Sequence, residues 1–467
     1  MAGIVAISSY YATSEPKRNN VIYYLVDAMR MLQHRGKAYW KVIVGNSSTS
    51  GEGSVPDSKT ILAIAQREKL RGSNGVGYLS KRQPPFTSMN NLWIAFDGFF
   101  VDTEKLHLHP YIGPAKDSDS LFKIYYIFTY LLLNKKDAWR AAEFLDRHLR
   151  GNLIIKVGDE IYAYRDGTGF KPLVMATNLE KTLNVIASEN SLRTTLTDME
   201  FRDVRPGQLL RMSEKRGGGG GGLEEVLPST SNSRVMMDPF EFIRESNVIA
   251  TVNGKSVYQI RKNIGKEQAN FLSKELPDID SAFAEPDYTR PMALGFGLEY
   301  SRYSKAFEFA EGIIKDRYDD ADHMIDFSEE VSKNKLLTTG RSLKFIMQNL
   351  TGGKKIATVQ GTIQTGSTAR ETIYYLRKAG ANRVDLIVSY VPTVDGRQVG
   401  LYTQNRDLIA NKYVGEVSTI NDLNQNIAKE IGSNSVYYNS PAILAKGIGV
   451  PEDNLWFPEW VRFLDYK

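Results

Sequence analysis

The chain contains no cysteine among its 467 residues. This absence excludes disulfides, thiolate metal sites, iron–sulfur clusters and a cysteine nucleophile. Histidine is scarce, with five residues whose spacing matches no ligand pattern, so we expect no metal site and no cofactor. Long apolar runs are also lacking: the most apolar helical stretch, 124–133, is shorter than the ~20 residues of a membrane span. The apolar residues 1–7 favour a buried strand over a signal peptide, and we expect a cytoplasmic protein without membrane contact.

What is present is the composition of a globular protein. Hydrophobic residues make up 42% of the chain and charged residues 24%, and the length predicts two or three domains. The net charge of +5 is small for this length, so it is weak support for a nucleic-acid partner.

An unbroken glycine run at 217–222 indicates a flexible connector, and we expect a domain boundary near Met236. The part before it predicts a layered α+β domain, with helices over 20–32 and 120–133. Its expected strands are 3–7, 39–44, 92–96, 153–157, 161–164, 185–188 and 208–212.

The part after the boundary alternates between strand and helix. A strand at 355–359, a helix at 367–378 and a strand at 384–388 predict a βαβ unit and hence a parallel sheet. A further helix is expected at 420–431.

The loop between that strand and helix is a candidate phosphate site. Hydroxyls of Thr365, Ser367 and Thr368 lie where a helix N-terminus favours negative charge. The alternative is a plain strand-to-helix turn with Ser367 as the N-cap, and spacing alone does not decide between the two.

Over nearly its whole length the chain resembles the amidophosphoribosyltransferase family. Leu32-Gln33-His34-Arg35-Gly36 is similar to that family's LQHRG segment, and Tyr164–Leu173 to its FRDPxGIRPL segment. Further similar segments follow in family order at 3–5, 187–190, 202–207, 240–242, 286–287, 315–318 and 379–381.

The resemblance implies an N-terminal-nucleophile-hydrolase-like αββα sandwich followed by an α/β type I phosphoribosyltransferase-like domain. The glutamine amidotransferase class II-like domain would span 1–236 and the phosphoribosyltransferase-like domain 237–434. The tail, 435–467, would pack back on the first domain.

The glutaminase positions depart from the family. Ala2 stands at the position of the cysteine nucleophile, and Ser80 at that of the arginine that binds the glutamine carboxylate. Asp97 stands at the oxyanion-hole asparagine, where its charge would repel a developing oxyanion. Only Asp119 keeps its counterpart, as a vestigial site for the substrate amino group. The resemblance therefore implies that glutamine hydrolysis is absent.

The phosphoribosyl site departs in part. Gln360 and Gly361 replace the paired aspartates that bind ribose hydroxyls in the family. The segments 284–289 and 321–324 also differ from the pyrophosphate-side and flexible-loop segments. The residues that would still bind a 5′-phosphate are Thr362, Thr365, Gly366, Ser367 and Thr368.

These departures favour a protein that is not an enzyme but a pseudoenzyme, acting as a regulatory, structural or binding subunit. Such a subunit would form a homo-oligomer or a complex with a paralogue, and would bind phosphate or a purine nucleotide. A first alternative is an interaction factor for the ribosome or another nucleoprotein, which a clustered basic surface would favour. A second alternative is a residual ammonia-dependent phosphoribosyltransferase of purine biosynthesis.

Overall fold

The chain forms two compact units. The first comprises Met1–Glu241, Glu245–Ser256 and Asp453–Trp456, and the second Phe242–Arg244, Val257–Glu452 and Phe457–Lys467. The computed structural model describes residues 2–10, 20–81, 92–104, 106–111, 120–213, 222–229, 235–276, 279–315, 344–400 and 404–466. Most of the glycine run and the segment 321–324 thus lie outside the described residues.

Unit 1 contains two antiparallel sheets. The seven-stranded sheet has the order β10-β8-β9-β1-β4-β2-β3 and the five-stranded sheet the order β12-β11-β7-β6-β5. The strands of the first are β1 (Ala2–Ser9), β2 (Tyr39–Val44), β3 (Ser47–Glu52), β4 (Asn74–Ser80), β8 (Val174–Asn178), β9 (Leu183–Ala187) and β10 (Met199–Asp203). Those of the second are β5 (Leu92–Phe100), β6 (Leu149–Val157), β7 (Glu160–Arg165), β11 (Leu209–Ser213) and β12 (Gly222–Leu227). A short hairpin, β13 (Thr251–Val252) with β14 (Lys255–Ser256), completes the unit.

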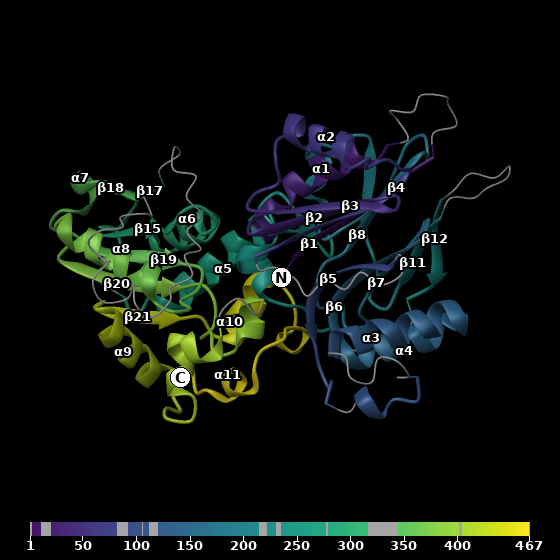
Figure 1. Cartoon of the computed structure of the whole chain (residues 1–467). Coiled ribbons are helices and arrows are strands. Elements are labelled where there is room, and N and C mark those ends of the chain that lie inside the picture. Colours follow the sequence, from purple (N-terminus) through teal and green to yellow (C-terminus); the bar gives the residue numbers. More distant parts are fainter. Residues whose placement is uncertain are drawn as a thin grey trace. The chain divides into compact units, whose positions relative to one another are not determined.

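Helices cover the outer face of each sheet (Figure 1). On the seven-stranded sheet these are α1 (Ile22–Met31) and α2 (Ser58–Arg67). On the five-stranded sheet they are α3 (Ser120–Thr129) and α4 (Ala138–His148). Unit 1 therefore has four layers, helices–sheet–sheet–helices.

Side-chain alternation along β1 explains this layering. Ile4 and Ala6 belong to the core between the sheets, whereas Val5 and Ile7 belong to the core under α1 and α2. Successive side chains of a strand point to opposite faces, so a strand buried on both faces is apolar throughout. The predicted αββα sandwich is confirmed.

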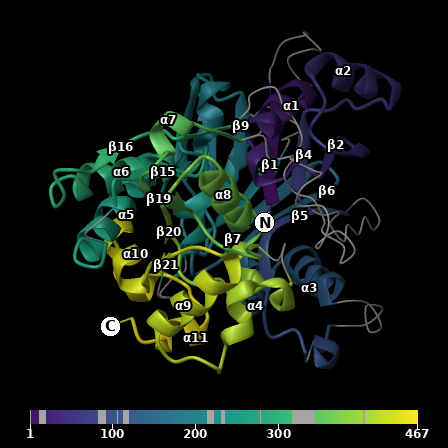
Figure 2. The same cartoon turned by 90° about the vertical axis from the view of Figure 1, so that its left-hand side faces the viewer.

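Unit 2 is built on a parallel sheet of order β16-β15-β19-β20-β21. Its strands are β15 (Ser281–Ala284), β16 (Glu308–Phe309), β19 (Lys355–Gln360), β20 (Arg383–Val388) and β21 (Ser435–Tyr438), and a separate pair is β17 (Ile313–Lys315) with β18 (Lys344–Ile346). Its helices are α5 (Val257–Leu272), α6 (Arg290–Tyr300), α7 (Gln348–Thr351), α8 (Ser367–Lys378), α9 (Ile420–Ile431), α10 (Pro441–Ile448) and α11 (Glu459–Phe463). Figure 2 shows α8 on one side of β19 and β20, with α5 and α10 on the other. The predicted α/β domain is confirmed.

Within the described residues, no helix has both the length and the apolarity needed to cross a membrane.

Helices α5 and α6 touch through their backbones. A Cβ atom added at Gly265 would lie 1.8 Å from the carbonyl oxygen of Met292, and one at Gly295 would lie 1.9 Å from that of Lys262. Contacts this short leave no room for a side chain, so glycine at both positions sets the distance between the two helices.

We expect Gly265→Ala to destabilise unit 2 by about 2 kcal/mol. Overpacking costs roughly 1–3 kcal/mol, and the better helix propensity of alanine returns at most about 1 kcal/mol. Hydrogen exchange of α5 and α6 amides measures the loss. Lys266→Ala, next in sequence and exposed, is the control and should change stability by less than about 0.5 kcal/mol. Unchanged protection in Gly265→Ala would show that the helices do not rely on this contact.

Candidate functional sites

The glutaminase positions named from the sequence meet at the end of β1. Ala2 is paired with Ser80 across β1 and β4, and its backbone N–H donates to Asp97 Oδ1 at 2.8 Å. All three residues are buried. Asp119 lies outside the described residues.

Close backbone contacts bring these segments together. A Cβ at Gly36 would lie 2.5 Å from the backbone of Ser80, so only glycine lets the turn after α1 approach the end of β4. Next to Asp97, Gly98 has φ of +148° and faces Gly151 across β5 and β6. A Cβ at Gly98 would lie 2.0 Å from the Arg150 carbonyl oxygen. The local sequence thus sets the position of Asp97.

The guanidinium of Arg35 is the centre of this site. Arg35 ends the 3-10 turn Gln33–Arg35 and is fully buried. Its Nη1 donates to Asp97 Oδ2 at 3.3 Å, its Nε to Glu189 Oε2 at 3.2 Å and its Nη2 to Glu241 Oε2 at 2.8 Å. Nη2 also lies 3.3 Å from Ser246 Oγ. One cation therefore binds three buried carboxylates.

Two lysines neutralise the remaining acids. Lys171 Nζ lies 2.5 Å from Asp238 Oδ2 and 3.0 Å from Glu241 Oε1, and Lys81 Nζ lies 3.6 Å from Glu245 Oε1. Burial raises the pKa of Asp238 to about 6, although Lys171 opposes the shift. The site is thus a network of paired charges inside unit 1.

The cations hold two of the carboxylates ionised. Burial alone would raise the pKa of Glu189, but His34 and Arg35 lower that pKa to about 2. Burial would likewise raise the pKa of Glu241, and Arg35 and Lys171 hold it well below its usual range. Such depressed values mean that the charged forms are the stable ones in this network.

Apart from Asp97, sequence reasoning did not assign roles to the charged members of this network. Arg35, Lys171, Glu189 and Glu241 each lie within a segment that resembles the family. For Lys171 and Glu241, a charged side chain between apolar neighbours was the signal that could have identified them, because such a residue needs a buried partner. Arg35 and Glu189 have polar or glycine neighbours and gave no such signal.

The candidate phosphate loop of unit 2 connects β19 to α8. Thr365 Oγ1 lies 3.0 Å from Ser367 Oγ, and both Thr365 and Thr368 are exposed. Gly366 is the N-cap, with φ of +81°, so the alternative in which Ser367 caps the helix is wrong. The hydroxyl of Thr362 makes a 2.8 Å hydrogen bond with that of Thr393.

A cation lies beside this loop. Arg370 Nη1 donates to the carbonyl oxygen of Thr365 at 3.1 Å, and its Nη2 lies 3.3 Å from Glu430 Oε1. The first turn of α8 thus combines the positive end of the helix dipole, hydroxyl donors and a guanidinium, a combination suited to an anion.

The other side of the loop is covered. A Cβ at Gly361 would lie 2.3 Å from the ring of Tyr288, and the Arg244 guanidinium lies 5.3 Å from the centre of that ring. Glu285 nearby is buried and accepts a 2.9 Å hydrogen bond from Thr372 Oγ1. Tyr288 therefore packs directly against the residue that follows β19.

The described residues contain no group of three or more His, Asp or Glu side chains that could hold a metal ion.

No protein-family model matches the chain. An amidophosphoribosyltransferase of Methanocaldococcus jannaschii is 27% identical over 96% of this chain and 94% of its own length. Among solved structures, the glutamine phosphoribosylpyrophosphate amidotransferase from B. subtilis, complexed with ADP and GMP, covers 96% of this chain and 92% of its own, with 22% identity and a TM-score of 0.70. A structure described as the allosteric regulatory enzyme of purine biosynthesis covers 97% and 94%, with 20% identity and a TM-score of 0.72.

These similarities correct one expectation. The departures from the family led us to expect that the chain is not an enzyme. Relatives from several species that match along most of the chain all carry an enzyme's name, and this contradicts the pseudoenzyme interpretation. The comparisons also give no support to a ribosomal partner.

The match extends through both units, and the solved structures share the two-unit fold. The chain is thus similar along most of its length to proteins named amidophosphoribosyltransferase, and it has the fold of the solved phosphoribosylpyrophosphate amidotransferase.

Proposed function

We propose that the chain transfers a phosphoribosyl group to free ammonia in purine biosynthesis. The observation that carries this proposal is the loop that leads into α8, where Thr365 and Thr368 are exposed. In the proposed reaction the ammonia lone pair bonds to C1 of the sugar while the bond from C1 to the leaving pyrophosphate oxygen breaks.

The loop would hold the 5′-phosphate of the donor. Thr365, Ser367 and Thr368 supply hydroxyl donors, and Gly366 lets the chain turn so that the first amides of α8 face the phosphate. Arg370 adds positive charge to the same turn. Hydrogen bonds to a charged group contribute about 1.5–3 kcal/mol each, so two or three of them would position the sugar.

Ammonia is proposed as the nitrogen donor because the site in unit 1 is unsuited to glutamine. The methyl group of Ala2 cannot attack an amide, and the chain has no cysteine to replace it. Asp97 presents a carboxylate, bound to Arg35, where the family places an oxyanion donor. Ser80 supplies no cation for the glutamine carboxylate.

The ribose would be bound differently from that in the family. Gln360 and Gly361 replace the paired aspartates, so no acidic pair follows β19 to organise a metal-bound ribose. We therefore propose that a nucleoside monophosphate binds modestly and independently of Mg²⁺. Purine nucleotides are the natural choice, since the B. subtilis relative was solved with ADP and GMP.

Two further properties remain proposals. We propose a cytoplasmic location, and assembly as a homo-oligomer or with a paralogue.

We expect the purified chain to release no glutamate from glutamine above background. Ala2→Cys alone should not restore the activity. Asp97 still cannot donate a hydrogen bond to the oxyanion, and Ser80 still provides no cation for the glutamine carboxylate. A coupled glutamate assay measures both proteins. Glutamate release by the unchanged chain would contradict the proposed ammonia dependence.

We expect pyrophosphate release from phosphoribosyl pyrophosphate to require ammonium salt. The variant Ser367→Ala should release pyrophosphate about tenfold or more slowly, because it loses a hydrogen bond to the phosphate. The same variant should weaken AMP binding in calorimetry by a similar factor, with or without Mg²⁺. Ser418→Ala, an exposed serine before α9, is the matched control and should behave as the unchanged chain. Absence of ammonia-dependent pyrophosphate release would refute the proposed reaction, and tight binding only with Mg²⁺ would refute the proposed mode of ribose binding.

A further inference from the structure

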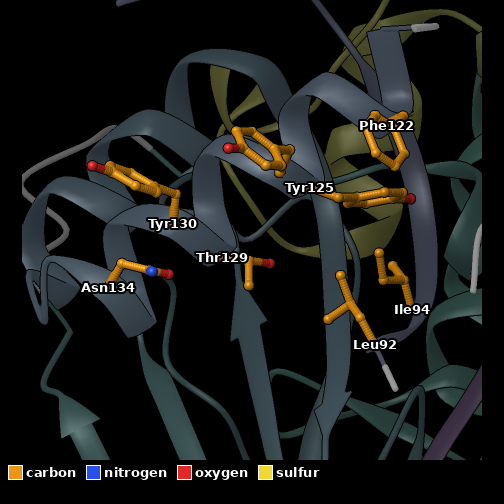
Figure 3. A pocket seen from close by; sticks show the side chains of 8 residues that line it. Leu92, Ile94, Phe122, Tyr125, Thr129, Tyr130 and Asn134 are labelled. Carbon is orange, nitrogen blue, oxygen red and sulfur yellow. The ribbon is translucent and has the colours of Figure 1, made fainter. Parts of the chain in front are cut away.

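The cavity of about 250 Å³ between α3 and β5 in unit 1 offers nothing to a charged ligand (Figure 3). Its lining side chains are aromatic, aliphatic or neutral and polar: Leu92, Ile94, Phe122, Tyr125, Tyr126, Thr129, Tyr130 and Asn134. An anion there would be buried without a charged partner, which is costly. A second contact for an anion must therefore come from a cation elsewhere in the chain.

Arg244 is such a cation. Its side chain is half-buried, and its guanidinium lies over the ring of Tyr288, 5.3 Å from the ring centre. Within the part of the chain that the structure describes, the ring is its one recorded partner, and no carboxylate or hydrogen-bond acceptor binds it. A guanidinium has five N–H donors, and an arginine that is removed from water ordinarily pairs them. Arg244 thus keeps its charge and its donors for a ligand.

Tyr288 connects Arg244 to the carboxyl ends of two parallel strands. Tyr288 follows β15, and Gly361 follows β19, the neighbour of β15 in the sheet. A Cβ at Gly361 would lie 2.3 Å from the Tyr288 ring, so one ring contacts both the guanidinium and the first residue of the loop. Ligands of open α/β sheets bind outside the carboxyl ends of the strands. Arg244 therefore lies at the opposite end of the loop from Thr365 and Thr368.

Two other arginines of unit 2 already bind carboxylates. Arg290 Nε lies 3.9 Å from Asp287 Oδ1 and 3.6 Å from Glu311 Oε1. Arg370 Nη2 lies 3.3 Å from Glu430 Oε1. Their charges are compensated within the chain, whereas that of Arg244 is not.

Stacking on the ring suits Arg244 to a phosphate group. The negative face of the ring attracts the cation and holds it in place. The N–H groups lie in the plane of the guanidinium, where they form a rigid fork that fits two phosphate oxygens. A cation that is already positioned loses little freedom when the ligand binds.

We propose that Arg244 binds the pyrophosphate end of the donor while the loop hydroxyls bind its 5′-phosphate. This inference rests on the proposed function, and it makes Arg244 the residue that selects phosphoribosyl pyrophosphate over ligands with a single phosphate. When ammonia displaces the pyrophosphate, the electron pair of the broken bond stays on the pyrophosphate oxygen, and the surplus proton of the new amine goes to solvent. Arg244 stabilises the charge that develops on that oxygen.

Calorimetry with phosphoribosyl pyrophosphate and ribose 5-phosphate tests the two ends of the site separately. The buffer contains EDTA, because a metal ion on the pyrophosphate would replace the charge of Arg244. We expect the unchanged chain to bind phosphoribosyl pyrophosphate at least tenfold more tightly than ribose 5-phosphate. Arg244→Gln should lower this preference about tenfold and leave the affinity for ribose 5-phosphate unchanged. Arg244→Lys keeps the charge and should retain more of the preference than Arg244→Gln.

Arg462→Gln is the matched control. Arg462 is also half-buried, with its guanidinium 5.6 Å from the centre of the Phe457 ring, and its replacement should change neither affinity. Ser367→Ala acts at the 5′-phosphate and should weaken both ligands alike. An unchanged preference in Arg244→Gln, or none in the unchanged chain, would refute the role of Arg244 while leaving the phosphate loop in place. Failure of both ligands to bind would refute this inference together with the proposed function.

Discussion

The buried guanidinium of Arg35 is the constraint on which the architecture of unit 1 depends. It connects the turn after α1 to β5, to the segment after β9 and to the π-helical turn at Glu241. The most distant partner along the chain, Ser246, is 211 residues from Arg35. Removing a buried partner of this kind costs roughly 3–5 kcal/mol, because the remaining carboxylates stay desolvated. Asp97 is tolerated as a buried carboxylate because this cation lies beside it.

The network also limits the pH range in which its charges are stabilising. Glu189 and Glu241 have pKa values below the usual 4.5, so they stabilise the fold above that pH and lose this contribution as the pH falls toward about 2. Asp238 behaves oppositely: its folded pKa of about 6 exceeds the usual 3.8, so its contribution is complete below 3.8 and is lost as the pH rises through 6. Lys171, which binds both Asp238 and Glu241, limits that loss.

The sequence predicted helices and strands accurately where the apolar residues recur at the spacing of a helix or of a strand. The helices Ser367–Lys378 and Ile420–Ile431 agree to the residue, and the strand at 355–359 is longer by one. The polar strand Ser47–Glu52 was missed, because it forms by pairing with β2 at a sheet edge and has no apolar alternation. The helix expected over 120–133 instead changes to a π-helical turn at Tyr130, which periodicity cannot detect. Motif resemblance identified Ala2, Ser80 and Asp97, but the pairing of Arg35 with Glu241 crosses 206 residues and needed the fold.

The two candidate sites differ in what their polar groups already bind. In unit 1, Arg35 and Asp97 hydrogen-bond each other and their neighbours, so a ligand would have to break buried ion pairs before forming its own contacts. In unit 2, Thr365 and Thr368 are exposed at a helix N-terminus, where an anion gains hydrogen bonds without displacing an ion pair. Binding is favoured where the protein is preorganised and no buried ion pair has to break. This difference in cost is the physical reason for the proposal that phosphoribosyl transfer takes place in unit 2.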